Sequence, residues 1–188
     1  LRRVKKLESF SLLPKSKQSL AKAKKIYFDH HCLQFWMIRE GVYEKFKKYG
    51  GTYELEIKWR NEYIEYWTGK LSIEDLTPVN NLSNAHATEA LPHLIEIADK
   101  GDEYAKLWFA NAIWEILEKN SDIAEEIREV GQKKVKAIWG DLCTQSTYSL
   151  SDAHKEEVAS FMYLANAQSP EKYIANYAKS QLMKLEGN

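Results

Sequence analysis

The most regular pattern of apolar and polar positions lies between residues 90 and 119, where two amphipathic segments flank Lys100-Gly101-Asp102. At about 100° of rotation per residue, the second segment presents one broad apolar arc. The arc consists of Tyr104, Ala105, Trp108, Phe109, Ala112, Ile113, Ile116 and Leu117. Leu107 and Trp114 form a second strip outside it, among acidic side chains. Such a helix is usually packed between neighbours or faces a partner. The pattern therefore predicts a helical hairpin with Trp108 in its core.

The helical period continues toward the N-terminus. Residues 16–48 read as helix, with a cap at Ser16 or Ser19 and a kink or packing contact at Gly41, before Gly50-Gly51 ends the run. Residues 52–68 predict an aromatic helix that stops at Gly69.

Three more helices are predicted after the central hairpin. Asp122 and Glu125 have the spacing of a capping box, and the helix that they open is expected to end at Gly140. Ser151 caps the next helix, and Ser169-Pro170 opens the last one with proline in its first turn. Because no segment alternates with period two, the sequence predicts an all-α fold of about seven helices, built as repeat-like stacked hairpins or as an irregular bundle.

Composition along the chain suggests a domain organisation. We expect a basic N-terminal arm over residues 1–25, an aromatic helical hairpin over 26–69, and a helical-hairpin region over 85–188. Residues 70–84 are rich in Asn, Ser and Asp and predict a linker loop. An alternative is one compact domain from residue 16 to 188.

Small residues in the central hairpin carry a family resemblance. They and their apolar neighbours are Ala90, Leu94, Ala98, Gly101, Ala105, Phe109 and Ala110. The pattern resembles one unit of the Sel1-type repeats, which are helical-hairpin relatives of the tetratricopeptide repeats. The resemblance implies that Gly101 ends one helix and that Ala105 and Ala110 let two helices approach closely. An ordinary hairpin in an irregular bundle is the alternative.

Cysteine usage and hydropathy bear on location. Cys32 and Cys143 lie far apart without a paired spacing, which favours a reducing, cytoplasmic setting, although one bridge between them stays open as an alternative. The longest nearly apolar run, residues 107–114, is too short for a membrane helix of about 20 residues. Residues 1–25 lack the apolar core of a secretory signal.

The charges are segregated although the net charge is zero. Residues 1–25 hold nine of the 27 Lys and Arg residues but one of the 27 Asp and Glu residues. A basic arm of this kind can contact phosphates, so a nucleic-acid partner is the alternative functional hypothesis. The arm could instead lie on the acidic remainder of its own chain or of a second copy. The candidate phosphate-binding residues are Arg2, Arg3, Lys5, Lys6, Lys22, Lys24 and Lys25.

Motifs for chemistry are weak. Residues 29–32 spell Asp-His-His-Cys, the signature of membrane palmitoyltransferases, but the surrounding zinc ligands and membrane spans of those enzymes are missing. His86, Glu89 and His93 have metal-ligand spacing, yet Pro92 interrupts the helical face that would align them. Cys143 and His154 lack an orienting Asn or Asp motif. We therefore predict no catalytic residue, no metal and no cofactor.

Two sets of residues remain as functional candidates. Arg39, Glu56 and Arg60 fall on apolar faces and predict either a buried ion network or a binding groove. The candidate partner-binding residues are Leu107, Trp114, Trp59, Tyr63 and Trp67. Stacked hairpins present side chains without catalytic geometry, so the sequence favours a non-enzymatic adaptor, inhibitor or scaffold that binds another protein through a helical groove.

Overall fold

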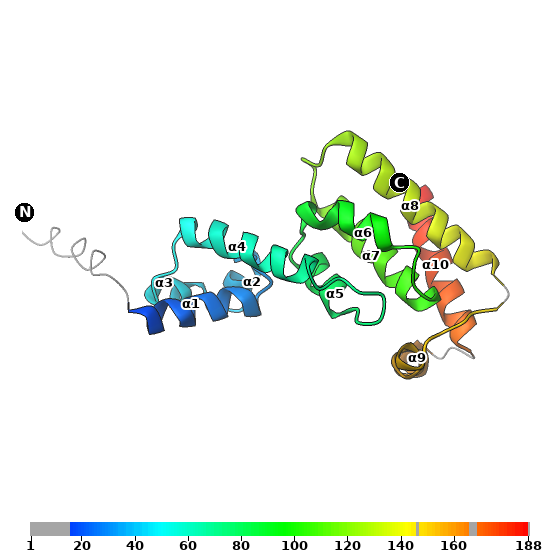
Figure 1. Cartoon of the computed structure of the whole chain (residues 1–188), viewed down its shortest axis with the longest axis horizontal. Helices are drawn as coiled ribbons and strands as arrows, with labels where there is room; N and C mark the ends of the chain where they lie inside the picture. Colours follow the sequence, from blue (N-terminus) through cyan, green and yellow to red (C-terminus); the bar gives the residue numbers. More distant parts are fainter. Residues whose placement is uncertain (1–15, 146, 166–168, 188) are drawn as a thin grey trace, which may run out of the picture. The chain divides into compact units, whose positions relative to one another are not determined.

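The computed structural model describes residues 16–145, 147–165 and 169–187. It is 75% helical, and the described residues form ten α-helices, one short 3-10 helix and no strand. The predicted all-α class is confirmed. The chain divides into two compact units, residues 1–63 and 64–188, which are described separately (Figure 1).

The first unit contains four helices. They are α1 (Lys17–Asp29), α2 (Gln34–Arg39), α3 (Tyr43–Lys48) and α4 (Tyr53–Thr68), the last of which extends into the second unit. Ser16 caps α1 as expected, because its hydroxyl accepts a hydrogen bond from the Ser19 amide at 3.1 Å. Helix α4 follows Gly50-Gly51 and ends before Gly69, close to the predicted bounds.

The helix predicted over residues 16–48 is broken twice, which corrects the sequence analysis. His31 and Cys32 adopt φ angles of 53° and 58° after α1, and Gly41 adopts 70° after α2. The first break lies at residues that are neither glycine nor proline, so the sequence does not indicate it. It turns the chain back so that the buried Met37 and Phe46 of α2 and α3 join the core of the unit.

Aromatic rings fill that core. Tyr27 of α1 lies 5.8 Å from Phe46 of α3 and 6.5 Å from Trp59 of α4, and Phe46 lies 6.4 Å from Trp59, all between ring centroids. A Cβ atom on Gly51 would lie 2.3 Å from the Phe46 ring, so this position requires glycine. The three rings therefore fix how α1, α3 and α4 pack.

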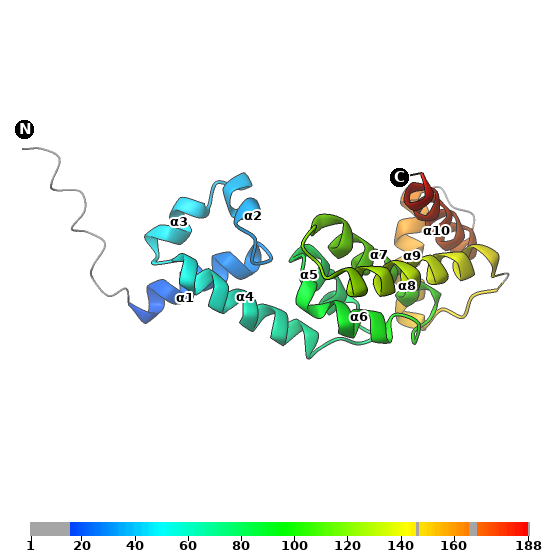
Figure 2. The ribbon, with the colours of Figure 1, turned by 90° about the horizontal axis from the view of Figure 1, so that it is seen from above.

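The second unit surrounds one central helix. Its elements are α5 (Thr77–Asn84), the 3-10 helix η2 (Thr88–Ala90), α6 (Leu91–Ile97), α7 (Glu103–Lys119), α8 (Glu125–Thr144), α9 (Asp152–Ala165) and α10 (Pro170–Glu186). Helix α7 contacts α5, α6, α8, α9 and α10 (Figure 2). The residues of its predicted arc are buried, apart from the half-buried Trp108.

The hairpin between α6 and α7 forms where the sequence predicts it. The Asp102 carboxylate accepts a hydrogen bond from the Ala105 amide at 2.8 Å and so caps α7. Gly101 lies close to this first turn, since a Cβ atom on it would be 2.6 Å from the Ala105 Cβ. Gly101 thus permits a close approach, whereas α6 ends earlier, at Ile97 with Ala98 as its C-cap.

Part of the expected linker loop is helix α5. Its turns contain Pro78, Val79 and Leu82, which are buried against α7. Of the polar residues that suggested a loop, Ser83 is buried, Asn80 is exposed, and Asn81 and Asn84 are half-buried. Burial of an apolar face thus outweighs a low helix propensity here.

Helix α8 differs from its prediction at both ends. Its N-cap is Ala124 without a side-chain hydrogen bond, so Asp122 and Glu125 do not form the expected capping box. Gly140 does not end it, because the helix continues to Thr144 and thereby buries Leu142. The caps predicted at Ser151 and Ser169 are present, with 3.3 Å hydrogen bonds from the amides three residues later.

Candidate functional site

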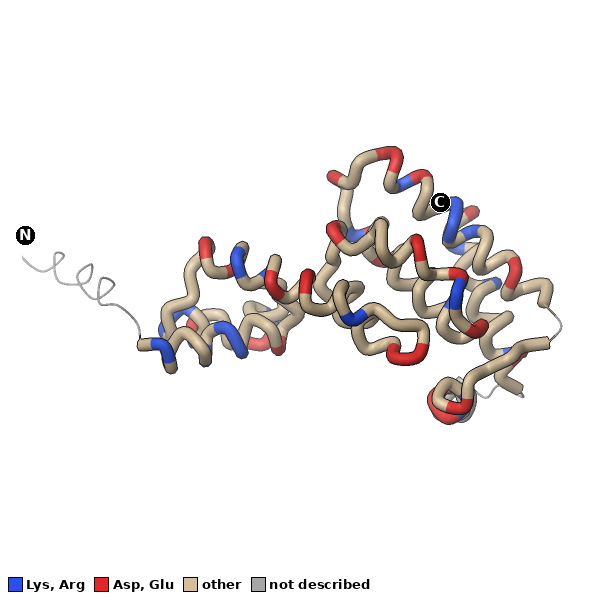
Figure 3. The backbone as a smooth tube through the Cα atoms, viewed as in Figure 1, with Lys and Arg blue, Asp and Glu red and all other residues tan. Residues whose placement is uncertain are grey.

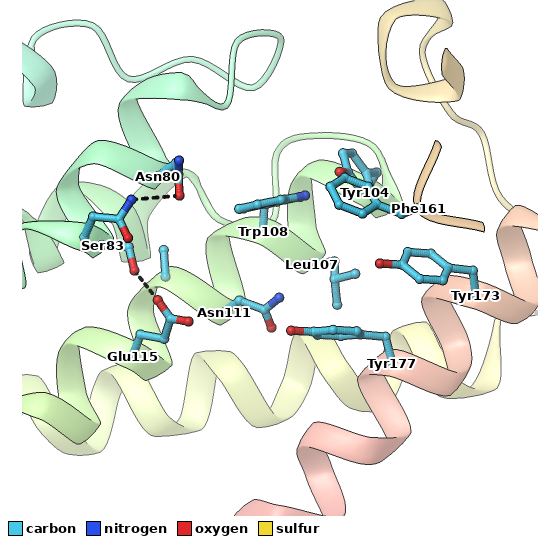
Figure 4. A pocket seen from close by; sticks show the side chains of 12 residues that line it. Asn80, Ser83, Tyr104, Leu107, Trp108, Asn111, Glu115, Phe161, Tyr173 and Tyr177 are labelled. Atoms are coloured by element: carbon cyan, nitrogen blue, oxygen red, sulfur yellow. Dashed lines mark hydrogen bonds between the residues drawn. The ribbon is translucent and has the colours of Figure 1, made fainter. Parts of the chain in front are cut away.

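A cavity of about 310 Å³ lies in the second unit between α5, α7, α9 and α10 (Figure 4). Five aromatic rings line it: Tyr104 and Trp108 of α7, Phe161 of α9, and Tyr173 and Tyr177 of α10. The Tyr104 and Trp108 centroids are 6.1 Å apart at 73°, and Phe161 stacks on Tyr173 at 6.5 Å. The rings form walls around a space rather than one closed cluster.

Helical spacing explains why α7 contributes half of this lining. The lining residues of α7 are Tyr104, Leu107, Trp108, Asn111, Ala112 and Glu115. Successive members are separated by three, one, three, one and three residues, which places them on one face of the helix. Both the predicted arc and the second strip supply members, so the cavity lies at the border between them.

Polar groups line the cavity together with the rings. Ser83 of α5 donates a hydrogen bond to Glu115 Oε2 at 2.6 Å. The side-chain oxygen of Asn111 is buried and has no hydrogen-bond partner among the described residues. In Figure 4 the Asn111 amide and the Tyr177 hydroxyl point toward the same space. A ligand with hydrogen-bond donors could satisfy the Asn111 oxygen, whose burial without a partner is costly.

Two further hollows adjoin the cavity along α7. One, of about 280 Å³, shares Asn80 and Trp108 with the cavity, and the other, of about 500 Å³, shares Asn111, Glu115 and Tyr177. The three together are named the α7 groove. Its Asp, Glu and Lys residues are Glu74, Asp75, Glu115, Glu118, Glu157 and Lys184, and His154 also lines it.

The tyrosines of the cavity are neutral at physiological pH. Burial raises the pKa of Tyr177, and the charge of Glu115 raises it further. Burial raises the pKa of Tyr173 too, and that of Tyr104 far above the ordinary value of 10.0. Their hydroxyls remain uncharged donors and acceptors, so the net charge of the groove comes from its carboxylates.

Hydrogen bonds that the Asp102 carboxylate accepts hold the start of α9 against the start of α7. Asp102 Oδ2 accepts hydrogen bonds from the Ser151 amide at 2.8 Å and from Nδ1 of the buried His154 at 2.7 Å. Burial raises the pKa of Asp102, but the hydrogen bonds from Ala105, Ser151 and His154 outweigh it and leave the pKa below the usual 3.8. The ionised carboxylate therefore positions the helix that carries Phe161.

The partner-binding residues predicted on α7 lie in or beside this groove. Leu107 lines the cavity but is only 3% exposed. Trp114 lines the hollow of about 500 Å³. Its ring centroid lies 6.1 Å from that of the buried Trp139 of α8, in an edge-to-face arrangement. Trp108, expected in the core, lines two of the three hollows. Trp108 and Trp114 are thus both half-buried, and both border the groove.

The aromatic candidates of α4 are placed differently. Trp59 and Tyr63 are 6% and 4% exposed, and Tyr63 lies 5.2 Å from the Phe28 ring of α1. Both belong to the core of the first unit and offer no surface to a partner. Trp67 is half-buried, with its ring 4.9 Å from that of Tyr66.

The charges predicted on apolar faces do not share one environment. Arg39 is exposed, and its guanidinium lies 5.0 Å from the Trp36 ring centroid. Glu56 and Arg60 are half-buried, and both act electrostatically on the phenol of Tyr27. Desolvation raises the pKa of Glu56. Arg39 thus contacts an aromatic ring instead of joining a buried network, because the break at Gly41 leaves it at the exposed end of α2.

The basic residues divide into two sets. Arg2, Arg3, Lys5 and Lys6 lie outside the described residues. Lys22, Lys24 and Lys25 belong to α1 and contact groups of their own unit: the Tyr49 ring, Glu62 and Asp29 respectively. Figure 3 shows that Lys and Arg positions are interspersed with Asp and Glu positions along the helices. These lysines would have to exchange such contacts to bind a phosphate.

The weaker chemical motifs do not assemble into reactive sites. Burial raises the pKa of Cys32 to about 12 and that of Cys143 above its ordinary value, so both are thiols and poor nucleophiles at neutral pH. His154 contacts Asp102, whereas the Cys143 thiol contacts the Ala175 carbonyl at 3.9 Å. Over the described residues, no three His, Cys, Asp or Glu side chains are grouped to hold a metal, His86, Glu89 and His93 included.

The side of the cavity that faces α7 was not predictable from the sequence. Tyr173 and Tyr177 are four residues apart on a predicted helix, which signals a packed face but not what it faces. Ser83 and Asn80 fell in the expected loop.

Among the described residues, no helix has the length and apolar character needed to cross a membrane. No protein-family model matches the chain, and comparison with curated proteins and with solved structures gives no significant match.

Proposed function

We propose that this protein is a non-enzymatic interaction module that binds a segment of another protein in the α7 groove. The observation that carries the proposal is the cavity between α5, α7, α9 and α10, which five aromatic rings line together with the buried, unpartnered side-chain oxygen of Asn111. Aromatic anchors around a pocket are the usual centres of binding energy at protein interfaces. The elongated groove suits a peptide segment better than a compact ligand.

Two further features belong to the same proposal. The hairpin of α6 and α7 would be a single Sel1-like unit, which the burial of Ala98, Ala105 and Ala110 supports. The free thiols of Cys32 and Cys143 fit a reducing cytoplasmic compartment.

Selection of peptides from a random displayed library on the immobilised full chain tests the proposal. Enriched peptides should bind the protein in fluorescence anisotropy measurements, and Tyr177→Ala should weaken that binding about tenfold, as removal of an aromatic anchor does. Tyr53→Ala is the matched control, because Tyr53 is 72% exposed on α4 and does not line the groove. Failure to enrich any peptide, or equal losses in the two variants, would refute the proposed function.

The nucleic-acid alternative rests on residues 1–25 and stays a prediction. Affinity for DNA or RNA that falls steeply with added salt would support it.

A further inference from the structure

The walls of the central cavity have the chemistry that attracts a cation. Trp108 and Tyr177 are both seen nearly edge-on in Figure 4, on opposite sides of the space, with Tyr173 pointing into it. Their ring faces carry negative electrostatic potential, and tryptophan and tyrosine are the strongest cation–π partners among protein side chains. Phe161 and Tyr104 complete the walls.

Carboxylates surround these rings. Glu115 lies at the cavity and at the hollow toward the end of α7, where Glu118 joins it. Glu74, Asp75 and Glu157 line the opposite hollow. Among the described residues that line the groove, Lys184 is the single lysine or arginine. The groove as a whole is therefore acidic, with its aromatic cavity in the middle.

The electrostatic effect of the carboxylates extends to the tyrosines of the cavity. The charge of Glu115 acts on the phenol of Tyr177, and that of Glu157 acts on the phenol of Tyr104. The negative charges of these carboxylates would repel an anionic ligand. An apolar side chain would leave the buried oxygen of Asn111 without a hydrogen-bond donor. A cationic group with N–H donors is attracted by the carboxylates, and it can donate a hydrogen bond to the Asn111 oxygen.

We propose that the α7 groove binds a basic segment of a partner protein, with one lysine ammonium or arginine guanidinium among the rings of the central cavity. The inference deepens the proposed function and rests on it. The cavity of about 310 Å³ is at the lower end of ligand-pocket sizes, which suits one long side chain. Flanking basic residues of the segment would contact the carboxylates of the two end hollows.

A matched pair of fluorescein-labelled peptides tests the inference on the full chain. One is a glycine, serine and alanine peptide of about twelve residues with lysine at every third position, and the other has norleucine in place of each lysine. Norleucine keeps the aliphatic stem but lacks the charge. The lysine peptide should bind in anisotropy titrations at least tenfold more tightly than the norleucine peptide.

Variants locate the binding. Glu115→Gln keeps an oxygen that can accept from Ser83 while removing the charge, and it should weaken the lysine peptide about threefold to tenfold. Trp108→Ala should weaken it about tenfold, in the range of a desolvated cation–π contact. The control is Glu129→Gln, a charge removal at an exposed α8 position that does not line the groove, and it should change affinity less than twofold.

Three results would overturn the inference. They are no binding of the lysine peptide, equal binding of the norleucine peptide, and equal losses in Glu115→Gln and Glu129→Gln. The proposed function is judged separately: displayed peptides that lose affinity in Tyr177→Ala but contain no basic residue would retain the interaction module and refute the cationic occupant.

Discussion

Both units of this protein are rich in aromatic side chains, but the rings are used in different ways. In the first unit, Tyr27, Phe46 and Trp59 lie with their centroids 5.8 to 6.5 Å apart and close on one another. In the second unit, rings such as Trp108 and Tyr177 surround a cavity of about 310 Å³. An abundance of aromatic residues on a helix therefore does not by itself indicate a binding surface.

The difference follows from what faces the rings. Helices α1 and α3 supply further rings to α4, so the space between them is filled. Opposite Trp108, α5 supplies short polar residues such as Asn80 and Ser83, which leave room. Side-chain size on the facing helix decides between a closed core and an open pocket.

The largest effect is expected in the closed aromatic cluster. Phe46→Ala should lower the stability of the first unit by about 3 to 5 kcal/mol, because the fully buried ring leaves a cavity that the backbone cannot collapse to fill. Hydrogen exchange of the α1 and α4 amides in urea would locate the loss. Phe35→Ala is the control, since Phe35 is 65% exposed and its truncation should change the stability by no more than about 0.5 kcal/mol. Comparable losses in the two variants would argue against a closed core.

The next largest effect concerns the wall of the open pocket. Asp102→Ala should lower the stability of the second unit by about 2 to 3 kcal/mol, because it removes the cap of α7 and leaves the buried His154 without its partner. The folded-state pKa of Asp102 lies below 3.8, so the ionised carboxylate stabilises the fold above about pH 4. This contribution is lost as the pH falls through the folded-state pKa.

Urea denaturation of the wild type and Asp102→Ala at several pH values measures this effect. The difference in stability should be largest near neutral pH and should shrink below pH 3.8. A difference that does not change with pH would show that the charge of Asp102 plays no part.

Truncation of a pocket ring should cost less than truncation of a core ring. Trp108→Ala should lower stability by about 1 to 2 kcal/mol, because the half-buried indole already borders open space and leaves little new cavity. Thermal unfolding of this variant beside Phe46→Ala makes the comparison directly. A loss as large as that of Phe46→Ala would mean that the pocket is a packed core in solution.

The smallest expected effect is a gain. Gly140→Ala should stabilise α8 by about 0.5 to 1 kcal/mol, because nothing lies within 4 Å of the added Cβ and alanine favours the helix. Gly131→Ala is the matched contrast in the same helix, since its Cβ would lie 2.9 Å from a Leu117 methyl group, and it should destabilise instead. Thermal melts of both variants check the opposite signs.

Local patterns determined much of this fold. The helical class, the hairpin around Asp102 and the caps at Ser16, Ser151 and Ser169 were predictable, because helix period and capping depend on residues three or four positions apart. The break at His31 and Cys32, helix α5 and the passage of α8 through Gly140 were not predictable. Each of these depends on apolar burial against another helix, which can override local propensity.

The candidate site shows the same division. The sequence by itself determined that α7 is apolar around most of its circumference, with Leu107, Trp108 and Trp114 on it. Only the tertiary structure decided that Trp114 contacts Trp139, that Trp59 and Tyr63 are enclosed, and that Trp108 faces open space. A helical pattern specifies which residues share a face. The neighbouring helices, which come from distant parts of the chain, decide whether that face is filled or left as a pocket.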